Sequence, residues 1–263
     1  MITSIATYGL DPDVQNWLNQ LTVSPSNNYI SNLTTLVVQL KAAGIWGQLD
    51  RMWIFATEQQ QHARISIVNP TSSQITEVNS PTWTTLSGYT GNGSSSYLNT
   101  NYNPNSNGVN YTLNNVSYGA YILTNIRSTT QIDIGCNNTS GGTIIMNTNF
   151  SVANCIVSYV NDSTGQINGT ETSTSVGLTS AIRTASSTST QYRNGVNQTV
   201  SNTPVSTAVP NINIYILAEN ISGSANSFST RKISMVFFGS GSINQLAFYN
   251  AFQIFAIQTG FNV

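Results

Sequence analysis

The sequence has very little charge. Only 6% of its 263 residues are Asp, Glu, Lys or Arg, and the formal net charge is −1; an average domain carries roughly 25% charged residues. Arg231 and Lys232 are its one pair of adjacent basic residues. Phosphate backbones and anionic lipid surfaces are bound through clusters of Lys and Arg. The composition therefore argues against a nucleic-acid-binding protein, and we expect no nucleic acid among its partners.

Residues that bind metals or act as nucleophiles are also scarce. The only histidine is His62, next to a run of glutamines, and no GxSxG elbow accompanies it, so we interpret it as a solvated side chain. The two cysteines, Cys136 and Cys155, form no CxxC motif or Cys/His cluster, and no calcium loop is present. We therefore expect no metal and no cofactor. The cysteines are either small core residues or a disulfide, because sequence does not fix their geometry.

Paired carboxylates are missing as well. A glycosidase needs two carboxylates in one cleft, whereas Asp133 stands alone in QIDIGC and Glu219 is equally isolated. Asp11 and Asp13 are close, but they lie at a predicted helix start, where Asp has an ordinary capping role. No phosphate-binding or dinucleotide-binding loop occurs. We therefore predict a protein that is not an enzyme, although carboxylates from separate strands could still converge.

Long apolar runs are absent. No stretch reaches the ~18 uninterrupted apolar residues of a membrane span, and the first residues, MITSIATYGLDPD, lack the basic and apolar regions of a secretory signal. Asn, Ser, Thr and Gln replace charge at the surface. Such side chains make hydrogen bonds that salt does not screen, and a net charge near zero favours association. We expect no membrane span, and we expect a homo-oligomer.

The first 50 residues have the spacing of two helices. Asp11-Pro12 and Ser24-Pro25 are helix start signals, and Gly44 is a helix end signal. The apolar positions between them recur every three or four residues, namely Val14, Trp17, Leu18 and Leu21, then Tyr29, Ile30, Leu33, Val37 and Leu40. Two short helices with one apolar face each are not stable alone. We predict that residues 1–50 form a helical segment that anchors the protein to other subunits.

From residue 51 onward, apolar residues alternate as in strands. The predicted shared faces are Met52/Ile54/Ala56, Val116/Tyr118/Ala120/Ile122/Ile126, Ile132/Ile134, Cys155/Val157/Tyr159, Ile212/Ile214/Ile216 and Ile233/Met235/Phe237. Strong turn formers, such as Asn194-Gly195, separate these runs. The pattern predicts an all-β fold, an antiparallel β-sandwich or jelly roll over residues 51–263. Residues 170–190 fit either a strand with polar flanks or a loop.

The chain ends in a predicted helix. Ser242 and Gln245 have capping-box spacing, and the helix is expected over residues 243–259. Its aromatic and aliphatic residues cover more than one face. The helix is therefore either buried on several sides within the chain or part of a contact between subunits.

Aromatic residues concentrate in a segment rich in Asn, Ser and Gly. They are Trp83, Tyr89, Tyr97, Tyr102 and Tyr111. Sugars are bound by rings that stack on their apolar faces and by amides that bond their hydroxyls. The first four are our candidate ligand-binding residues. The alternative is that these rings fill the sandwich interior.

Four stretches together resemble the concanavalin A-like, laminin G-like sandwich proteins of bacteriophage virions. They are LKAAGIWGQLDRMWIF (residues 40–55), GYTGNGSSSYLNTNYNP (88–104), YRNG (192–195) and ISMVFFGSGSINQLAFYNAFQIF (233–255). In that family YRNG looks like the tip of a hairpin, and a capped helix follows the last strand.

The resemblance implies a non-enzymatic virion structural protein, of the fibre, spike or capsid-decoration type. Such a protein is assembled in the host cytoplasm and displayed on the capsid or tail surface, with other virion proteins and a host-surface glycan or receptor as partners. The calcium loops of many laminin G-like domains are not visible here. Two alternatives remain: a glycan-active hydrolase of the same sandwich class, and a purely architectural capsid component.

Overall fold

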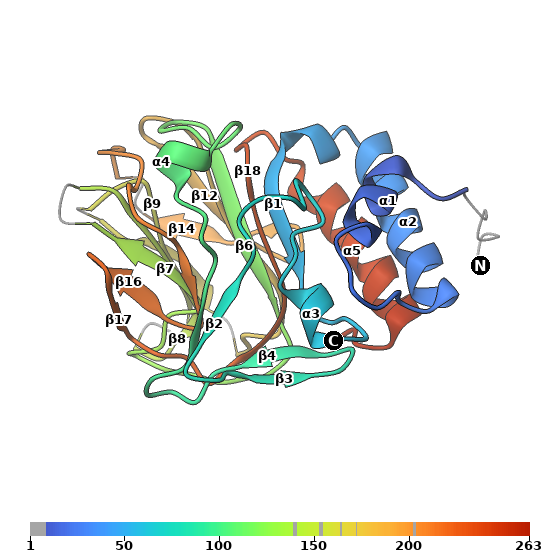
Figure 1. Ribbon diagram of the computed structural model, residues 1–263. Helices are drawn as coiled ribbons and strands as arrows, with labels where there is room; N and C mark the ends of the chain where they lie inside the picture. The colour runs from blue at the N-terminus through green and yellow to red at the C-terminus, as the bar shows by residue number, and fades with distance from the viewer. Residues whose placement is uncertain (1–8, 139–140, 153–154, 164, 172, 202–203) are drawn as a thin grey trace.

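In a computed structural model, which describes residues 9–263 except 139–140, 153–154, 164, 172 and 202–203, two stacked β-sheets lie beside a layer of helices (Figure 1). This confirms the predicted β-sandwich with helices at both ends of the chain. The helices are α1 (Pro12–Leu18), α2 (Asn27–Ala42), α3 (Gln60–Ala63), α4 (Pro104–Asn107), α5 (Gln245–Thr259) and a 3-10 turn, η1 (Trp46–Gln48). No helix among the described residues is long and apolar enough to cross a membrane.

Sheet A is the middle layer of the molecule. It contains β1 (Leu49–Ile54), β3 (Thr82–Thr84), β4 (Gly88–Thr90), β6 (Val116–Ile122), β11 (Gly177–Ala185), β12 (Thr188–Arg193), β13 (Val196–Asn197) and β18 (Lys232–Gly239). Its spatial order is β13-β12-β11-β6-β18-β4-β3, and β1 pairs with β18. All its pairs are antiparallel.

Sheet B is the outer layer on the side away from the helices (Figure 1). It contains β2 (Thr76–Val78), β5 (Tyr97–Asn99), β7 (Ile134–Asn137), β8 (Thr143–Phe150), β9 (Cys155–Val160), β10 (Ile167–Glu171), β14 (Thr199–Ser201), β15 (Tyr215–Ile216), β16 (Glu219–Ile221) and β17 (Ser224–Asn226). The pair β16–β7 is parallel and the others are antiparallel.

Sheet A is buried on both faces, because alternate residues serve two cores. In β1, Met52 and Ile54 lie on one face together with Ala56, as predicted. This face packs against the helices, whereas Trp53 faces sheet B. The predicted common face of Ile233, Met235 and Phe237 is wrong. A β-bulge in β18 interrupts the alternation, so Ile233 lies between the sheets while Met235 and Phe237 face the helices.

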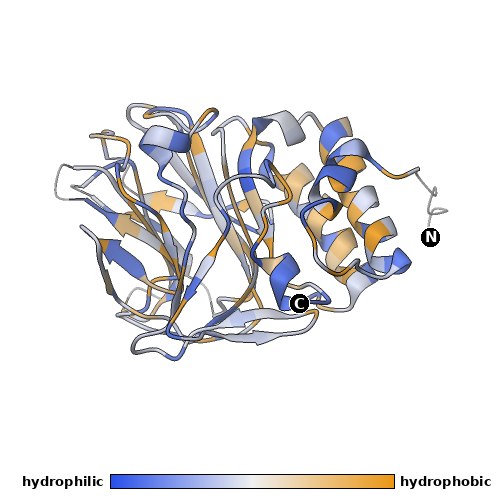
Figure 2. Ribbon diagram, viewed as in Figure 1, coloured by the Kyte–Doolittle hydropathy of each residue, from blue (hydrophilic) through white to orange (hydrophobic). Residues whose placement is uncertain are grey.

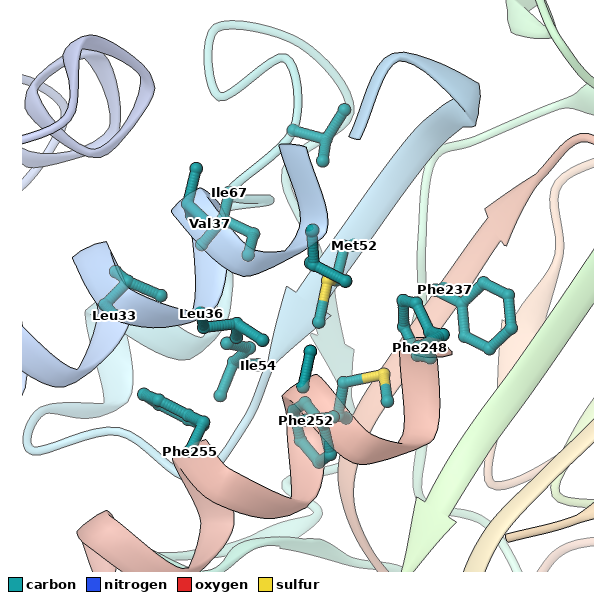
Figure 3. Close-up of a cluster of buried hydrophobic side chains, with 14 of the residues drawn as sticks. Leu33, Leu36, Val37, Met52, Ile54, Ile67, Phe237, Phe248, Phe252 and Phe255 are labelled. Carbon is teal, nitrogen blue, oxygen red and sulfur yellow. The ribbon is translucent and has the colours of Figure 1, made fainter. Parts of the chain in front are cut away.

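The helices form a core of their own with the outer face of sheet A. Figure 3 shows Leu33, Leu36 and Val37 of α2 and Phe248, Phe252 and Phe255 of α5 meeting Met52, Ile54 and Phe237 of the sheet. In Figure 2 apolar and polar positions alternate along these helices, as expected for elements with one buried side. Most of the aromatic surface of α5 is thus covered within the chain, and α1 and α2 are packed parts of the same body.

A polar contact also holds the α1–α2 connection to the sandwich, and it corrects the prediction for His62. This side chain is fully buried, not solvated. Its ring meets Trp17 edge-on at 5.7 Å, and its Nε2 donates to the carbonyl of Val23 at 2.7 Å. Nearby, the indole of Trp17 donates to Ile65 O at 3.2 Å. Sequence gave no sign of this burial, because the covering residues are about 40 positions away (62 − 23 = 39).

Two helix starts differ from the prediction. Helix α1 is capped by Asp11 as expected, but the cap of α2 is Ser26 rather than Ser24. Helix α5 is capped by Asn244, which accepts from Ala247 N, so the predicted capping box at Ser242 is wrong. Gln245 instead accepts from Ser180 Oγ at 2.6 Å, which docks the helix on β11. Each observed N-cap lies two positions after the predicted one and is also a residue type that favours N-caps, so the local sequence does not distinguish the two positions.

The turn at Asn194-Gly195 and the helix end at Gly44 are confirmed. Asn194 and Gly195 both have positive φ, 51° and 77°, and join β12 to β13, so YRNG is the end of a hairpin. Residues 170–190 are largely strand, since β11 and the start of β12 lie in this range. Gly44, with φ of 68°, follows the end of α2 as predicted.

The two cysteines are free and buried, in β7 and β9. Strand β8 lies between these strands, and two strand spacings alone place the two Cα atoms at least about 9–10 Å apart, beyond the reach of a disulfide. Burial raises the pKa of both thiols.

We therefore expect no reaction of either thiol with a thiol reagent in the native protein, and two reactive thiols per chain after denaturation without reductant. Titration with a chromogenic disulfide measures both. Denatured protein that yields no free thiol would contradict the placement of β8 between the two cysteines.

Candidate functional site

Two of the four candidate rings lie in the core, which corrects their prediction as ligand contacts. Tyr89 and Tyr102 are 0% exposed. The ring of Tyr89 packs edge-on against Phe55 at 5.4 Å, and the hydroxyl of Tyr102 donates to Asp50 Oδ2 at 3.0 Å. Tyr111 is buried as well. A polar neighbourhood in sequence did not indicate exposure, because these strands are too short to show a clear alternation.

Trp83 lies at the rim of the sandwich. It is half-buried in β3 and packs against the core between the sheets. Its indole N–H donates to Phe55 O at 3.0 Å. Its polar atom is therefore already engaged within the fold, and Trp83 is separate from the site described next.

Tyr97 is brought into a cluster of three rings. It stacks on Tyr215 with centroids 4.5 Å apart and an interplanar angle of 31°. The ring of Phe228 lies 6.2 Å from that of Tyr97. Tyr97 contacts both other rings; Tyr97 and Phe228 are partly buried, and Tyr215 is 7% exposed. We call Tyr97, Tyr215 and Phe228 the outer-face cluster.

Strand register puts these rings on the outside of sheet B. Leu98 and Ile216 point between the sheets and belong to the sandwich core. They pair with each other across β5 and β15, and Tyr97 and Tyr215 are their respective neighbours. Since successive side chains alternate in direction, the side chains of both tyrosines project from the outer face of sheet B. Helices α1, α2 and α5 lie on the opposite side of the molecule, beyond sheet A (Figure 1).

A carboxylate shares this face. Tyr215 and Glu219 are both register partners of Gly135. A Cβ at Gly135 would lie only 3.2 Å from Cβ of Glu219, so glycine there permits a close approach. Ser227, the residue before Phe228, donates to Glu219 Oε2 at 3.4 Å. Glu219 thus lies beside the segment that carries one of the three rings.

Burial shifts the pKa values of two groups at the site, Glu219 and Tyr215. Glu219 is 6% exposed and forms no ion pair among the described residues. Burial raises the pKa of its carboxyl group, opposed by hydrogen bonds from Asn137 and Ser227. Burial, with the hydrogen bond to Tyr97, raises the pKa of Tyr215 to about 12. Apart from Glu219, the site presents neutral hydroxyl, amide and ring surfaces.

The raised pKa of Glu219 makes stability depend on pH. Because the folded state holds this proton more tightly than the unfolded chain does, the contribution is full below the unfolded pKa of ~4.3 and is lost as pH rises through the folded value. We expect wild-type protein to lose stability relative to Glu219→Gln as the pH rises above about 4. Urea midpoints of both proteins across this range measure the difference, and parallel curves would contradict it.

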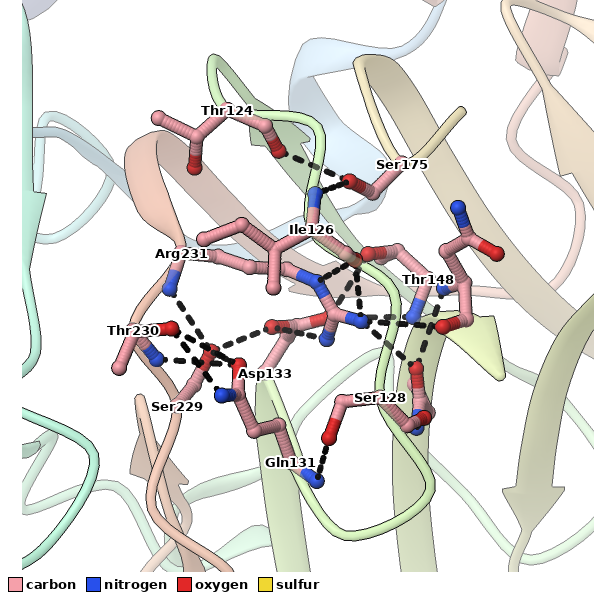
Figure 4. A network of polar contacts seen from close by, with 12 residues as sticks. Thr124, Ile126, Ser128, Gln131, Asp133, Thr148, Ser175, Ser229, Thr230 and Arg231 are labelled. Atoms are coloured by element: carbon pink, nitrogen blue, oxygen red, sulfur yellow. Dashed lines mark hydrogen bonds and ion pairs between the residues drawn. The ribbon is translucent and has the colours of Figure 1, made fainter. Parts of the chain in front are cut away.

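Asp133, the other acid considered for catalysis, is unavailable to any substrate. Figure 4 shows it inside a polar network with Arg231. Both side chains are 0% exposed, and Arg231 Nη1 lies 2.9 Å from Asp133 Oδ2. Thr148 and Ser229 also donate to this carboxylate. Its role is structural.

The sequence predicted Tyr97 as a ligand contact and presented Glu219 only as an isolated acid, whereas Tyr215 and Phe228 were not predicted. For Tyr215 a signal existed, because it falls between Ile214 and Ile216, whose shared face was predicted. The residue between two inward positions must point outward. Nothing local marked Phe228, because the ring that it contacts, Tyr97, is more than 100 residues away in sequence (228 − 97 = 131).

Comparisons with known proteins give the fold. No protein-family model and no curated protein matches the chain. The binding domain of botulinum neurotoxin DC, solved in complex with rat synaptotagmin II, aligns with a TM-score of 0.53 and 13% identity over 78% of this chain and 52% of that one. Trypanosoma rangeli sialidase in complex with 2,3-difluoro-KDN aligns with a TM-score of 0.51 and 9% identity over 89% of this chain and 40% of that one.

The chain thus spans about half, or less, of each of these solved chains. At such low identity the likeness establishes a shared β-sandwich fold.

Proposed function

We propose that the protein is a non-enzymatic recognition module that binds carbohydrate through the outer face of sheet B. The observation that carries the proposal is the outer-face cluster, in which Tyr97 contacts Tyr215 and Phe228 on the face of sheet B that points away from α1, α2 and α5. Contiguous apolar groups that reach the surface commonly mark a binding site, and Tyr97 and Phe228 are both partly accessible. Sugar rings offer apolar C–H faces to such groups and hydroxyls to the surrounding amides.

The low charge supports a neutral ligand surface. With 6% charged residues, the protein has little long-range field to attract an ionic partner. Contacts through amides, hydroxyls and rings are insensitive to salt. We therefore expect binding to persist when the salt concentration is raised, in contrast to a site built on Lys or Arg.

The second part of the proposal concerns where the protein is displayed. The resemblance of four sequence stretches to phage virion sandwich proteins supports a surface-displayed component of a bacteriophage particle, of the fibre, spike or decoration type. Immunogold labelling of intact particles with an antibody against the full chain tests this. Labelled particle surfaces are the expected result, and particles that lack the chain by mass spectrometry would refute the setting while leaving carbohydrate binding to its own test.

The binding test is a glycan array and host-surface polysaccharides probed with wild-type protein, Tyr97→Ala and Phe228→Ala. Each substitution removes part of the ring surface, and we expect affinity to fall by at least about tenfold. Tyr192→Ala is the matched control, because Tyr192 is a half-buried tyrosine of sheet A. Circular dichroism verifies folding of each variant. Binding that all three variants retain, or no binding by wild-type protein at high concentration, would overturn the proposal.

The raised pKa of Glu219 favours one second candidate, a glycan-active hydrolase, because a protonated carboxyl group is what a general acid requires. Incubating wild-type protein and Glu219→Gln with the polysaccharides that bind decides between the two. Our proposal expects no turnover by either protein. Turnover by wild-type protein that disappears in Glu219→Gln would establish the hydrolase.

A further inference from the structure

A cleft on the helical side of the molecule has the chemistry of a second binding site. It has a volume of about 300 Å³ and lies between α1 and the loop at residues 67–71, at the lower end of the range for small-molecule sites. One ring and several amides line it, namely Trp46, Asn16, Asn19, Gln20 and Asn69, together with Asp13. None of these residues belongs to the outer-face cluster.

The ring of the cleft is held in place. Trp46, in η1, is half-exposed and packs partly against the core under the helices. The ammonium group of Lys41 lies 5.9 Å from the centroid of this ring. The same ammonium is bound by Asp11 at 2.7 Å and Asp13 at 2.6 Å. The indole is therefore preorganised, which reduces the entropy that a ligand must overcome on stacking.

The far wall is equally fixed. Ile67 N donates to Met52 O at 2.8 Å, which ties the loop to β1. Asn69 has a φ of 54°, and its amide donates to Asp50 O at 3.4 Å. The indole of Trp17 joins α1 to the start of this loop through Ile65. The loop is thus attached to sheet A and α1 to the segment that leads into the loop, so the cleft exists before any ligand arrives.

The charges of the cleft select the class of ligand. Two carboxylates, Asp11 and Asp13, share one ammonium group, Lys41, so the local charge is about −1. This disfavours phosphate, sulfate and sialic acid. The amides of α1 and Asn69 can donate to and accept from uncharged hydroxyl groups. A ring, a set of amides and a slight negative charge fit a neutral sugar.

We propose that the cleft between α1 and residues 67–71 binds a neutral saccharide, one or two hexose units long, with a sugar face stacked on Trp46. This goes beyond the recognition assigned to sheet B and stands on different residues in a different layer of the protein. The molecule then has two saccharide sites, one on the outer sheet and one beside the helices.

The experiment is saturation-transfer NMR of the full chain with neutral disaccharides (maltose, cellobiose, lactose) and with sialyllactose as the anionic comparison. Trp46→Ala removes the stacking surface. Asn16→Ala, at an exposed position of α1, removes an amide without a cost in folding. The matched control is Asn250→Ala, an exposed asparagine of α5. Tyr97→Ala reports on the sheet-B site separately.

We expect a neutral disaccharide to bind wild-type protein and Asn250→Ala alike, and the Trp46-dependent part of its signal to persist in Tyr97→Ala. In Trp46→Ala we expect binding at the cleft to be about tenfold weaker, with a smaller loss for Asn16→Ala. Sialyllactose should show no signal that depends on Trp46. The proposal is overturned if no neutral disaccharide gives a Trp46-dependent signal, or if sialyllactose does. Loss of glycan binding in Tyr97→Ala alone would support sheet B while refuting the cleft, so the two proposals fail separately.

Discussion

Replacing Arg231 by methionine is expected to lower the free energy of unfolding by about 3–5 kcal/mol, because it leaves a buried carboxylate without its cation. Arg231 Nη1 bonds both oxygens of Asp133, at 3.0 and 2.9 Å. Its Nε and Nη2 donate to Ile126 O at 3.0 and 2.8 Å. The guanidinium group thus joins the segment just before β18 to the segment just before β7 and to the loop after β6 (Figure 4).

Urea unfolding of Arg231→Met measures the effect, and Arg64→Met is the matched control. Arg64 has a side chain 44% exposed and lies 3.9 Å from Glu77, and an exposed pair of this kind contributes ~0–1 kcal/mol. The double variant Asp133→Leu/Arg231→Met should recover much of the loss, since it removes both charges together. Equal, small losses for Arg231→Met and Arg64→Met would contradict the buried network.

Asp50→Ala is expected to cost about 3–4 kcal/mol, because Asp50 satisfies four donors at once. Its carboxylate is 1% exposed and accepts from the backbone N–H groups of residues 109, 110 and 111 at 3.1, 2.8 and 3.0 Å. It also accepts from the hydroxyl of Tyr102. Without it these donors face no acceptor, and the loop loses its attachment to β1.

Hydrogen exchange separates this effect from general destabilisation. In Asp50→Ala the amides of residues 109–111 should lose protection more than those of β6, which are bonded within sheet A. Asp50→Asn keeps one acceptor oxygen and should lose less stability than Asp50→Ala. Unchanged protection of residues 109–111 in Asp50→Ala would show that the carboxylate does not hold the loop.

The sandwich was predictable because strand alternation is a strong signal wherever a strand is regular. Val116, Tyr118, Ala120 and Ile122 of the predicted face lie in the core between the sheets, whereas Ile126, beyond the end of β6, does not. The signal failed in β18, where one bulged residue moved Ile233 to the opposite face from Met235. A bulge depends on pairing with a partner strand, and no property of the strand's own sequence marks it.

The candidate site was predictable only in part, for the same reason. Tyr97 and Tyr89 look alike in sequence, yet register turns Tyr97 outward while Tyr89 packs against Phe55. Burial of His62 likewise depends on Val23, which arrives from a separate element. Whether an aromatic side chain lies at the surface or in the core depends on pairing with distant strands, which a single sequence does not reveal.

Chemical-shift mapping of the isotope-labelled full chain with the tightest-binding glycan from the array tests the central claim most directly. If the outer face of sheet B is the recognition surface, the largest changes fall on the outer-face cluster and its neighbours in β5, β15 and β16, and they disappear in Tyr97→Ala. Changes confined to sheet A and the helices, with Tyr97, Tyr215 and Phe228 unaffected, would contradict the account.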